Sequence, residues 1–177
     1  MRLKLFFSLL LLSPILGGIP NAFAQTQDAD IHIVPGTAWR ASVTRDGSEF
    51  VSCQIAKKTN SAEVRFTIGS KGGFVFIVHD IYQERMISEV LGWDEGLSFR
   101  AQLFADNMGL LNVEAHRIWE HSLLVPLGAI DRRKLLQTKN IALQVGGIAM
   151  RGYDIAGIKA ALPDLFTCYE AHSAKHN

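Results

Sequence analysis

The chain has 177 residues and a nearly balanced charge, with 18 Lys and Arg against 17 Asp and Glu. This length suits a single domain that buries its own core. A formal net charge of +1 disfavours nucleic-acid binding, which calls for a strongly basic surface. The sequence also has no polybasic run that would attach it to an anionic membrane surface.

The N-terminus has the three zones of a secretory signal peptide. Arg2 and Lys4 precede an apolar block at residues 5–12, and the small-residue sequence Ala-Phe-Ala follows at residues 22–24. A proline and a glycine pair interrupt the apolar stretch, which therefore falls short of the roughly 20 residues of a membrane span. We predict a cleaved signal peptide over residues 1–24, with an uncleaved anchor helix as the alternative. Cleavage changes the net charge from +1 to −1 and places the mature protein in the periplasm or outside the cell.

Two cysteines, Cys53 and Cys168, remain after this cleavage. Exported proteins meet an oxidising environment in which paired thiols persist as disulfides. Only one intramolecular pairing is open to two cysteines, so we predict a disulfide between Cys53 and Cys168, with two buried free thiols as the alternative. The pair lacks the C-x-x-C spacing that zinc sites favour. No metal or other cofactor is indicated.

The first half of the mature chain reads as short strands. A flexible segment is expected over residues 25–36, with a short edge strand at residues 31–34 as a further possibility within it. The domain begins near residue 37. Apolar and polar residues alternate with a period of two at residues 50–56 and 62–68, which predicts two half-buried strands.

A glycine-rich loop then leads into residues 74–78, which are apolar on both faces. Two β-prone runs joined by such a loop predict a hairpin between residues 62–68 and 74–78. Strands that are apolar on both faces are usually central and covered on both sides. We therefore expect a helix or a second sheet over the outer face of this hairpin.

The second half mixes strands with short helices. Residues 84–91 suggest a short helix, although residues 81 and 82 could instead extend the preceding strand. Residues 97–103 and 110–119 alternate and predict a second hairpin. The remaining expectations are a strand end or loop at 123–127, a short surface helix at 129–137, a strand at 141–145 and helical spacing over 156–172, where Pro163 either kinks one helix or begins a second.

About seven short strands with turn signals between them indicate a mainly β protein. The predicted fold is an antiparallel β-sandwich or barrel with a C-terminal helix packed on it. One β-rich domain is expected over residues 37–172, followed by a tail at residues 173–177.

Several landmarks occur in an order found in one family. They are the signal peptide, Trp39 and Cys53, the sequence Leu-Val-Pro-Leu-Gly at residues 124–128 before a charged helix, and the segment from Tyr153 to Leu162. In these features the chain resembles the invasion-associated locus B family of exported bacterial proteins. The resemblance implies a closing strand and a glycine-led helix at the last segment. It also implies an envelope protein linked to host association or stress, with no known catalytic apparatus.

Enzyme motifs are weak throughout the sequence. His116 and His121 are five residues apart, whereas the H-E-x-x-H zinc motif needs a separation of four. There is no G-x-S-x-G nucleophile elbow. His79 and Asp80 follow a buried strand, which is a position where catalytic groups often lie. We predict that the protein is not an enzyme, with a hydrolase that uses His79, Asp80 and His116 as the alternative.

Binding is the favoured class, because exported β domains commonly present loops and sheet edges to partners. Aromatic residues near strand ends are candidate interface anchors, with ordinary core packing as the alternative for each. The candidate partner-binding residues are His79, Asp80, Tyr82, Trp93 and Trp119, and Tyr153 is a further aromatic residue near a strand end. We predict a periplasmic or envelope binding or accessory protein with a protein partner. The alternative is an inhibitor or immunity protein against a cell-wall hydrolase, with residues 79–82 or Trp93 on a projecting loop.

Overall fold

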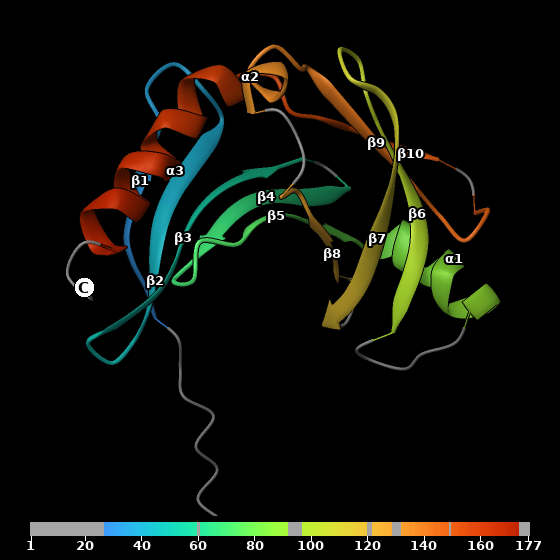
Figure 1. Ribbon diagram of the computed structural model, residues 1–177, viewed down its shortest axis with the longest axis horizontal. Coiled ribbons are helices and arrows are strands. Elements are labelled where there is room, and N and C mark those ends of the chain that lie inside the picture. Colours follow the sequence, from blue (N-terminus) through green and yellow to red (C-terminus); the bar gives the residue numbers. More distant parts are fainter. Residues whose placement is uncertain are drawn as a thin grey trace, which may run out of the picture.

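A computed structural model describes residues 27–59, 61–91, 97–119, 122–128, 132–148 and 150–173. Within these ranges, ten strands form one antiparallel sheet in the order β1-β2-β3-β4-β5-β8-β7-β6-β9-β10 (Figure 1). The predicted signal peptide and residues 174–177 of the predicted tail lie outside the described residues.

The elements follow one another in a regular order along the chain. The first five strands are β1 (Gln27–Ile33), β2 (Trp39–Asp46), β3 (Glu49–Lys58), β4 (Ala62–Gly69) and β5 (Phe74–Asp80). They are followed by α1 (Ile81–Leu91), β6 (Ser98–Ala105), β7 (Gly109–Trp119), β8 (Ser122–Pro126), α2 (Arg132–Leu135), β9 (Asn140–Val145), β10 (Arg151–Asp154) and α3 (Ile158–Ser173). None of the helices in these ranges has the length and apolar character needed to cross a membrane.

One face of the sheet carries the core, as the period-two alternation predicts. Across the central strands, Ile55 lies opposite Phe66, Phe66 opposite Phe76, and Phe76 opposite Val125. All four side chains are fully buried. We call this the inner face of the sheet. The alternating residues point to the outer face.

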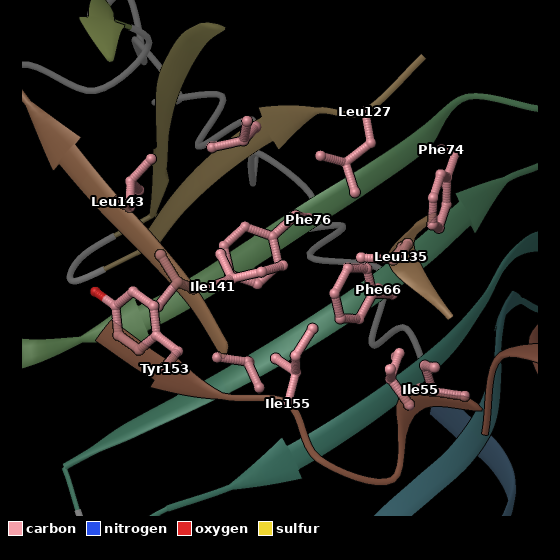
Figure 2. Close-up of a cluster of buried hydrophobic side chains, with 14 of the residues drawn as sticks. Ile55, Phe66, Phe74, Phe76, Leu127, Leu135, Ile141, Leu143, Tyr153 and Ile155 are labelled. Atoms are coloured by element: carbon pink, nitrogen blue, oxygen red, sulfur yellow. The ribbon is translucent and has the colours of Figure 1, made fainter. Parts of the chain in front are cut away.

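The sheet curls so that its last strands face its central strands across the core. Tyr153 of β10 lies with its ring centroid 6.4 Å from that of Phe76 on β5, and Ile141 and Leu143 of β9 point toward the same cluster (Figure 2). The sheet is open, because β1 and β10 form its two edges and do not pair with each other. The predicted mainly β fold with a C-terminal helix is therefore confirmed.

Helix α3 covers the inner face over β2, β3 and β4 (Figure 1). Its residue Phe166 lies 5.9 Å from Phe74 between ring centroids. Cys168 forms the predicted disulfide with Cys53, with their Cα atoms 6.0 Å apart. A single helix runs through the exposed Pro163, so the alternative of two helices is wrong.

Side chains bridge the open seam between β10 and the first strands. The indole Nε1 of Trp39 donates to the carbonyl of Ala156 at 3.1 Å. Lys57, which lies opposite Trp39, donates to the carboxylate of Asp154 at 2.8 Å and to the same carbonyl at 3.2 Å. These contacts join the two parts of the sheet that share no backbone ladder.

Three expectations need correction. Residues 27–33 belong to β1, which pairs with β2, so the predicted flexible segment is wrong over residues 27–30, and the edge strand considered at residues 31–34 begins earlier, at Gln27. Of the two alternatives at residues 123–127, the strand end is confirmed: residues 122–126 form β8, a central strand between β5 and β7, and Pro126 stands at its last position and leaves the ladder intact. Helix α1 begins at Ile81 and not at residue 84. A helix or a second sheet was expected over the outer face of the first hairpin, but α3 packs on the inner face, over β2, β3 and β4.

Candidate functional site

The strand β5 ends in two polar residues that point to opposite faces of the sheet. His79 lies opposite Ser122 and Glu63 on the outer face, where it is half-buried. Asp80 points inward and is only 2% exposed. It is therefore inaccessible to a partner, in contrast to the sequence expectation.

The carboxylate of Asp80 holds three elements together. Its Oδ1 accepts the backbone N–H groups of Tyr82 at 3.0 Å and Gln83 at 3.2 Å, which caps the N-terminus of α1. Its Oδ2 accepts hydrogen bonds from Arg151 Nε and from the hydroxyl of Tyr153, both at 3.1 Å, so that β10 is tied to β5. An ion pair to Arg151 Nη2 at 3.0 Å balances the buried charge.

Tyr153 is part of the same buried network. Its hydroxyl hydrogen-bonds Asp80 and the side-chain carbonyl of Gln83, whose amide donates to the carbonyl of Leu143 at 3.1 Å. Burial, and next the charge of Asp80, raise the pKa of Tyr153 far above its ordinary value, so the phenol stays protonated. The core-packing alternative holds for this aromatic residue.

Sequence reasoning missed Gln83 and Arg151. A signal for Gln83 was present, because Asp80 and Gln83 have the spacing of a capping box, which pairs a capping side chain with Glu or Gln three residues later. No local pattern marks Arg151, since it is 71 residues from Asp80 in the chain.

Above this network lies an exposed group of large side chains, which we call the Tyr82 patch. It consists of Ile81 and Tyr82 from the first turn of α1, Arg151 at the start of β10, and Met150 immediately before it. Tyr82 is 63% exposed, and Ile81 and Met150 are also exposed. The Arg151 guanidinium lies 5.7 Å from the centre of the Tyr82 ring, within cation–π range.

A depression of about 390 Å³ adjoins the patch on the outer face of β4, β5 and β8. Ile81 lines the depression as well as the patch, so the two surfaces are continuous. His79 Nδ1 and Ser122 Oγ are 3.1 Å apart in its wall, and Glu63 pairs there with Arg65. The polar residues that line it are Lys58, Thr59, Ser61, Glu63, Arg65, His79 and Ser122.

The residues of the predicted hydrolase alternative do not converge. His79 and Asp80 point to opposite faces, and His116 hydrogen-bonds Ser98 at 2.8 Å on the β6–β7 hairpin. Strand β8 separates β5 from β7 in the sheet. The Ser122–His79 contact is one step of a triad, and the carboxylate of Glu63, opposite His79, accepts a hydrogen bond from Arg65.

Trp93 lies outside the described residues, and Trp119 is the last residue of β7. A second, larger groove of about 1010 Å³ lies over β6, β7 and β9, with Arg100 opposite Glu114. Of the sequence-predicted site residues that the structure describes, none is among those that line this groove.

The chain was compared with known proteins in three ways. A scan against protein-family models finds no match, and searches of the curated proteins and of the solved structures find none either.

Proposed function

We propose that the chain is an exported envelope protein that binds a protein partner through the Tyr82 patch. One observation carries this proposal: the buried carboxylate of Asp80 holds the Arg151 guanidinium in place against the exposed ring of Tyr82. Tyr and Arg are enriched among the residues that dominate binding energy. Side chains that are already held in place lose less conformational entropy when a partner binds.

Export is supported by two independent features. The N-terminal sequence has the zones of a signal peptide, and Cys53 is bonded to Cys168. Disulfides persist in the periplasm and outside the cell, whereas cytosolic thiols are kept reduced.

The resemblance to the invasion-associated locus B family supports the same proposal. That resemblance implies a closing strand followed by a glycine-led helix, and β10 is followed here by Gly157 and α3. The proposed role is accordingly an accessory one in the bacterial envelope, linked to host association or to envelope stress.

Cross-linking from the patch tests the proposal. A photo-reactive amino acid replaces Tyr82 in one variant and Phe104, an exposed residue of β6, in a matched control. We expect a discrete adduct in envelope preparations from position 82 and none from position 104. The adduct should weaken when Arg151→Gln is added. Equal adducts from both positions, or none from position 82, would refute the proposed patch.

The inhibitor alternative placed residues 79–82 or Trp93 on a projecting loop. The first option loses its support, because β5 ends at Asp80 and α1 begins at Ile81 with no loop between them, and Trp93 lies outside the described residues. A panel of lytic enzymes tests the alternative directly, because an inhibitor would protect purified cell wall and a Tyr82→Ala variant would not. We expect no protection by either protein.

A further inference from the structure

A histidine, His172, lies beside the disulfide, and the S–S bond itself does not depend on it. The Sγ atoms of Cys53 and Cys168 and a ring nitrogen of His172 all lie within 4.8 Å of one another. Cys53 comes from β3, and the other two residues are one helical turn apart in α3. Among the described residues, this is the one group of three or more such side chains that meets the spacing of a metal site.

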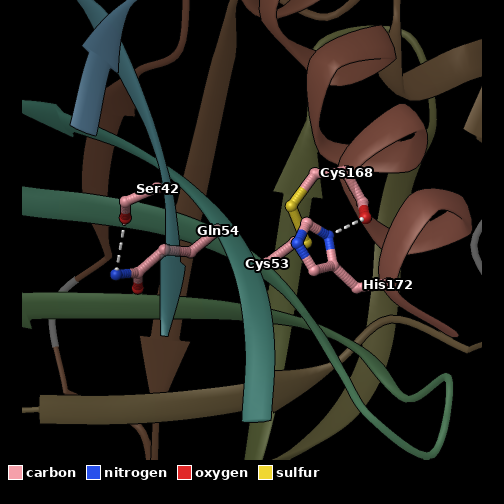
Figure 3. The surroundings of a disulfide bond; sticks show 5 residues. All are labelled: Ser42, Cys53, Gln54, Cys168 and His172. Atoms are coloured by element: carbon pink, nitrogen blue, oxygen red, sulfur yellow. Dashed lines mark hydrogen bonds between the residues drawn. A yellow bond between two sulfur atoms is a disulfide. The ribbon is translucent and has the colours of Figure 1, made fainter. Parts of the chain in front are cut away.

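The orientation of His172 leaves one ring nitrogen available as a ligand. Its Nδ1 lies 2.8 Å from the backbone carbonyl of Cys168. A carbonyl only accepts hydrogen bonds, so Nδ1 carries the proton and the neutral ring has its lone pair on Nε2. That second nitrogen faces the disulfide (Figure 3). The ring stacks on Phe50, with centroids 5.4 Å apart, which fixes its direction.

We propose that Cys53, Cys168 and His172 form a site for a thiophilic metal ion, Zn²⁺ or Cu⁺, when the disulfide is reduced. A dithiol reductant supplies two electrons and two protons. The S–S bond breaks, two thiols form, and the reductant becomes a disulfide. The metal ion then displaces the two thiol protons and accepts the Nε2 lone pair, which gives a Cys₂His ligand set.

Three features make this ligand set suitable. Thiolate and imidazole donors select Zn²⁺ and Cu⁺ over hard cations such as Mg²⁺. An imidazole that donates its other N–H to a backbone carbonyl has the support found for metal-ligating histidines. Cys53 is fully buried, whereas Cys168 and His172 are half-buried, so an ion and any further ligand have access from the side of α3.

Metal titration of the reduced chain tests the proposal. The mature protein is reduced with a dithiol, freed of reductant without air and titrated with Zn²⁺ alone, Cu⁺ alone or Cd²⁺ alone, the last for its thiolate charge-transfer absorption. We expect one equivalent to bind and to raise the melting temperature of the reduced protein. The oxidised protein should not show this binding.

Two histidine variants separate ligation from packing. His172→Ala should weaken metal binding by about tenfold or more, since even residues that only support a ligand contribute that much. His32→Ala is the matched control, because His32 also contacts α3, through Asp164 at 3.2 Å, and lies outside the cluster. Its affinity for metal should equal that of the wild type.

The outcomes are decisive even if the reduced chain unfolds. In that case the metal should restore its circular dichroism spectrum, and failure to restore it refutes the proposal. Absence of one-equivalent binding, or equal binding by the His172→Ala and wild-type proteins, refutes it as well. The partner-binding proposal is tested independently, because Tyr82→Ala should leave metal binding unchanged.

Discussion

At the scale of single residues, Asp80 links three elements of the fold. Its carboxylate is buried and accepts hydrogen bonds from α1 and β10 while it belongs to β5. Removing one partner of a buried ion pair leaves the other charge without compensation, which costs more than the pair itself contributes. The position of Asp80 at a strand end therefore reflects structure, although the same position suggested function in the sequence.

Asp80→Asn tests this structural role. The variant keeps the shape and a capping oxygen but removes the charge that balances Arg151. Because Arg151 is partly exposed, we expect the low end of the usual cost, a loss of about 3 kcal/mol in the free energy of unfolding by urea. Asp164→Asn is the control, since its exposed pair with His32 should contribute less than about 1 kcal/mol. Equal losses in both variants would contradict the structural role of Asp80.

Asp154 predicts a pH dependence of stability. The hydrogen bond from Lys57, and next that from the N–H of Ala156, hold the pKa of Asp154 below its ordinary value of 3.8. A carboxyl with a lower pKa in the folded state stabilises the protein above its unfolded-state pKa, and this contribution disappears as the pH falls through the folded-state pKa.

The difference in unfolding free energy between wild type and Asp154→Asn should follow this window. Above about pH 5 the difference should be constant, with the wild type more stable, and below about pH 4 it should shrink toward zero. Urea titrations at a series of pH values measure it. A difference that grows on acidification would contradict the predicted sign.

At the scale of elements, the junction between β10 and α3 depends on Gly157. Its φ of +86° lies in the left-handed region, and an added Cβ would lie 3.3 Å from Thr37 Cγ2 and 3.4 Å from Trp39 Cδ1. Trp39 also hydrogen-bonds Ala156, so the chain passes close to β2 at this turn. A side chain at position 157 would strain the backbone and push on this contact.

Gly157→Ala should therefore destabilise the protein, and by about 1–3 kcal/mol, through left-handed strain and crowding. Gly152→Ala is the matched control, because no atom lies within 4 Å of its added Cβ and its φ is not positive. We expect the control to change stability by less than about 0.5 kcal/mol. Thermal unfolding of both variants and of the wild type measures these changes. A Gly157→Ala protein as stable as the wild type would contradict the prediction.

Short-range sequence patterns predicted the strands that pair with their neighbours in the chain. The β4–β5 and β6–β7 hairpins both follow from alternation on either side of a short turn. The signal for β8 left a strand end or a loop open, because Pro126 suits both; its pairing with β7 is local, and only its other partner, β5, is distant in the chain. Strand β1 begins with polar residues, since an edge strand needs backbone pairing more than apolar side chains.

At the scale of the whole molecule, the strand order could not be read from the sequence. The order β5-β8-β7-β6-β9 reverses the direction of the chain across the sheet, and nothing in the alternation of single strands specifies it. The same limit applies to the candidate site. Tyr82 was identified from its residue type, but its neighbour Arg151 arrives only when β10 folds back over the core.

The disulfide acts at this largest scale, because it closes a segment of 115 residues that runs from β3 to α3. In the chain-entropy model, a loop of that length loses enough freedom in the unfolded state to stabilise the fold by about 4–5 kcal/mol. The double variant Cys53→Ala with Cys168→Ala should therefore unfold at much lower urea concentration than the oxidised wild type. Wild type reduced with dithiothreitol in the presence of EDTA should match the double variant, since EDTA excludes any contribution from bound metal. An unchanged urea midpoint in the double variant would show that the seam contacts and core packing hold α3 on the sheet without the bond.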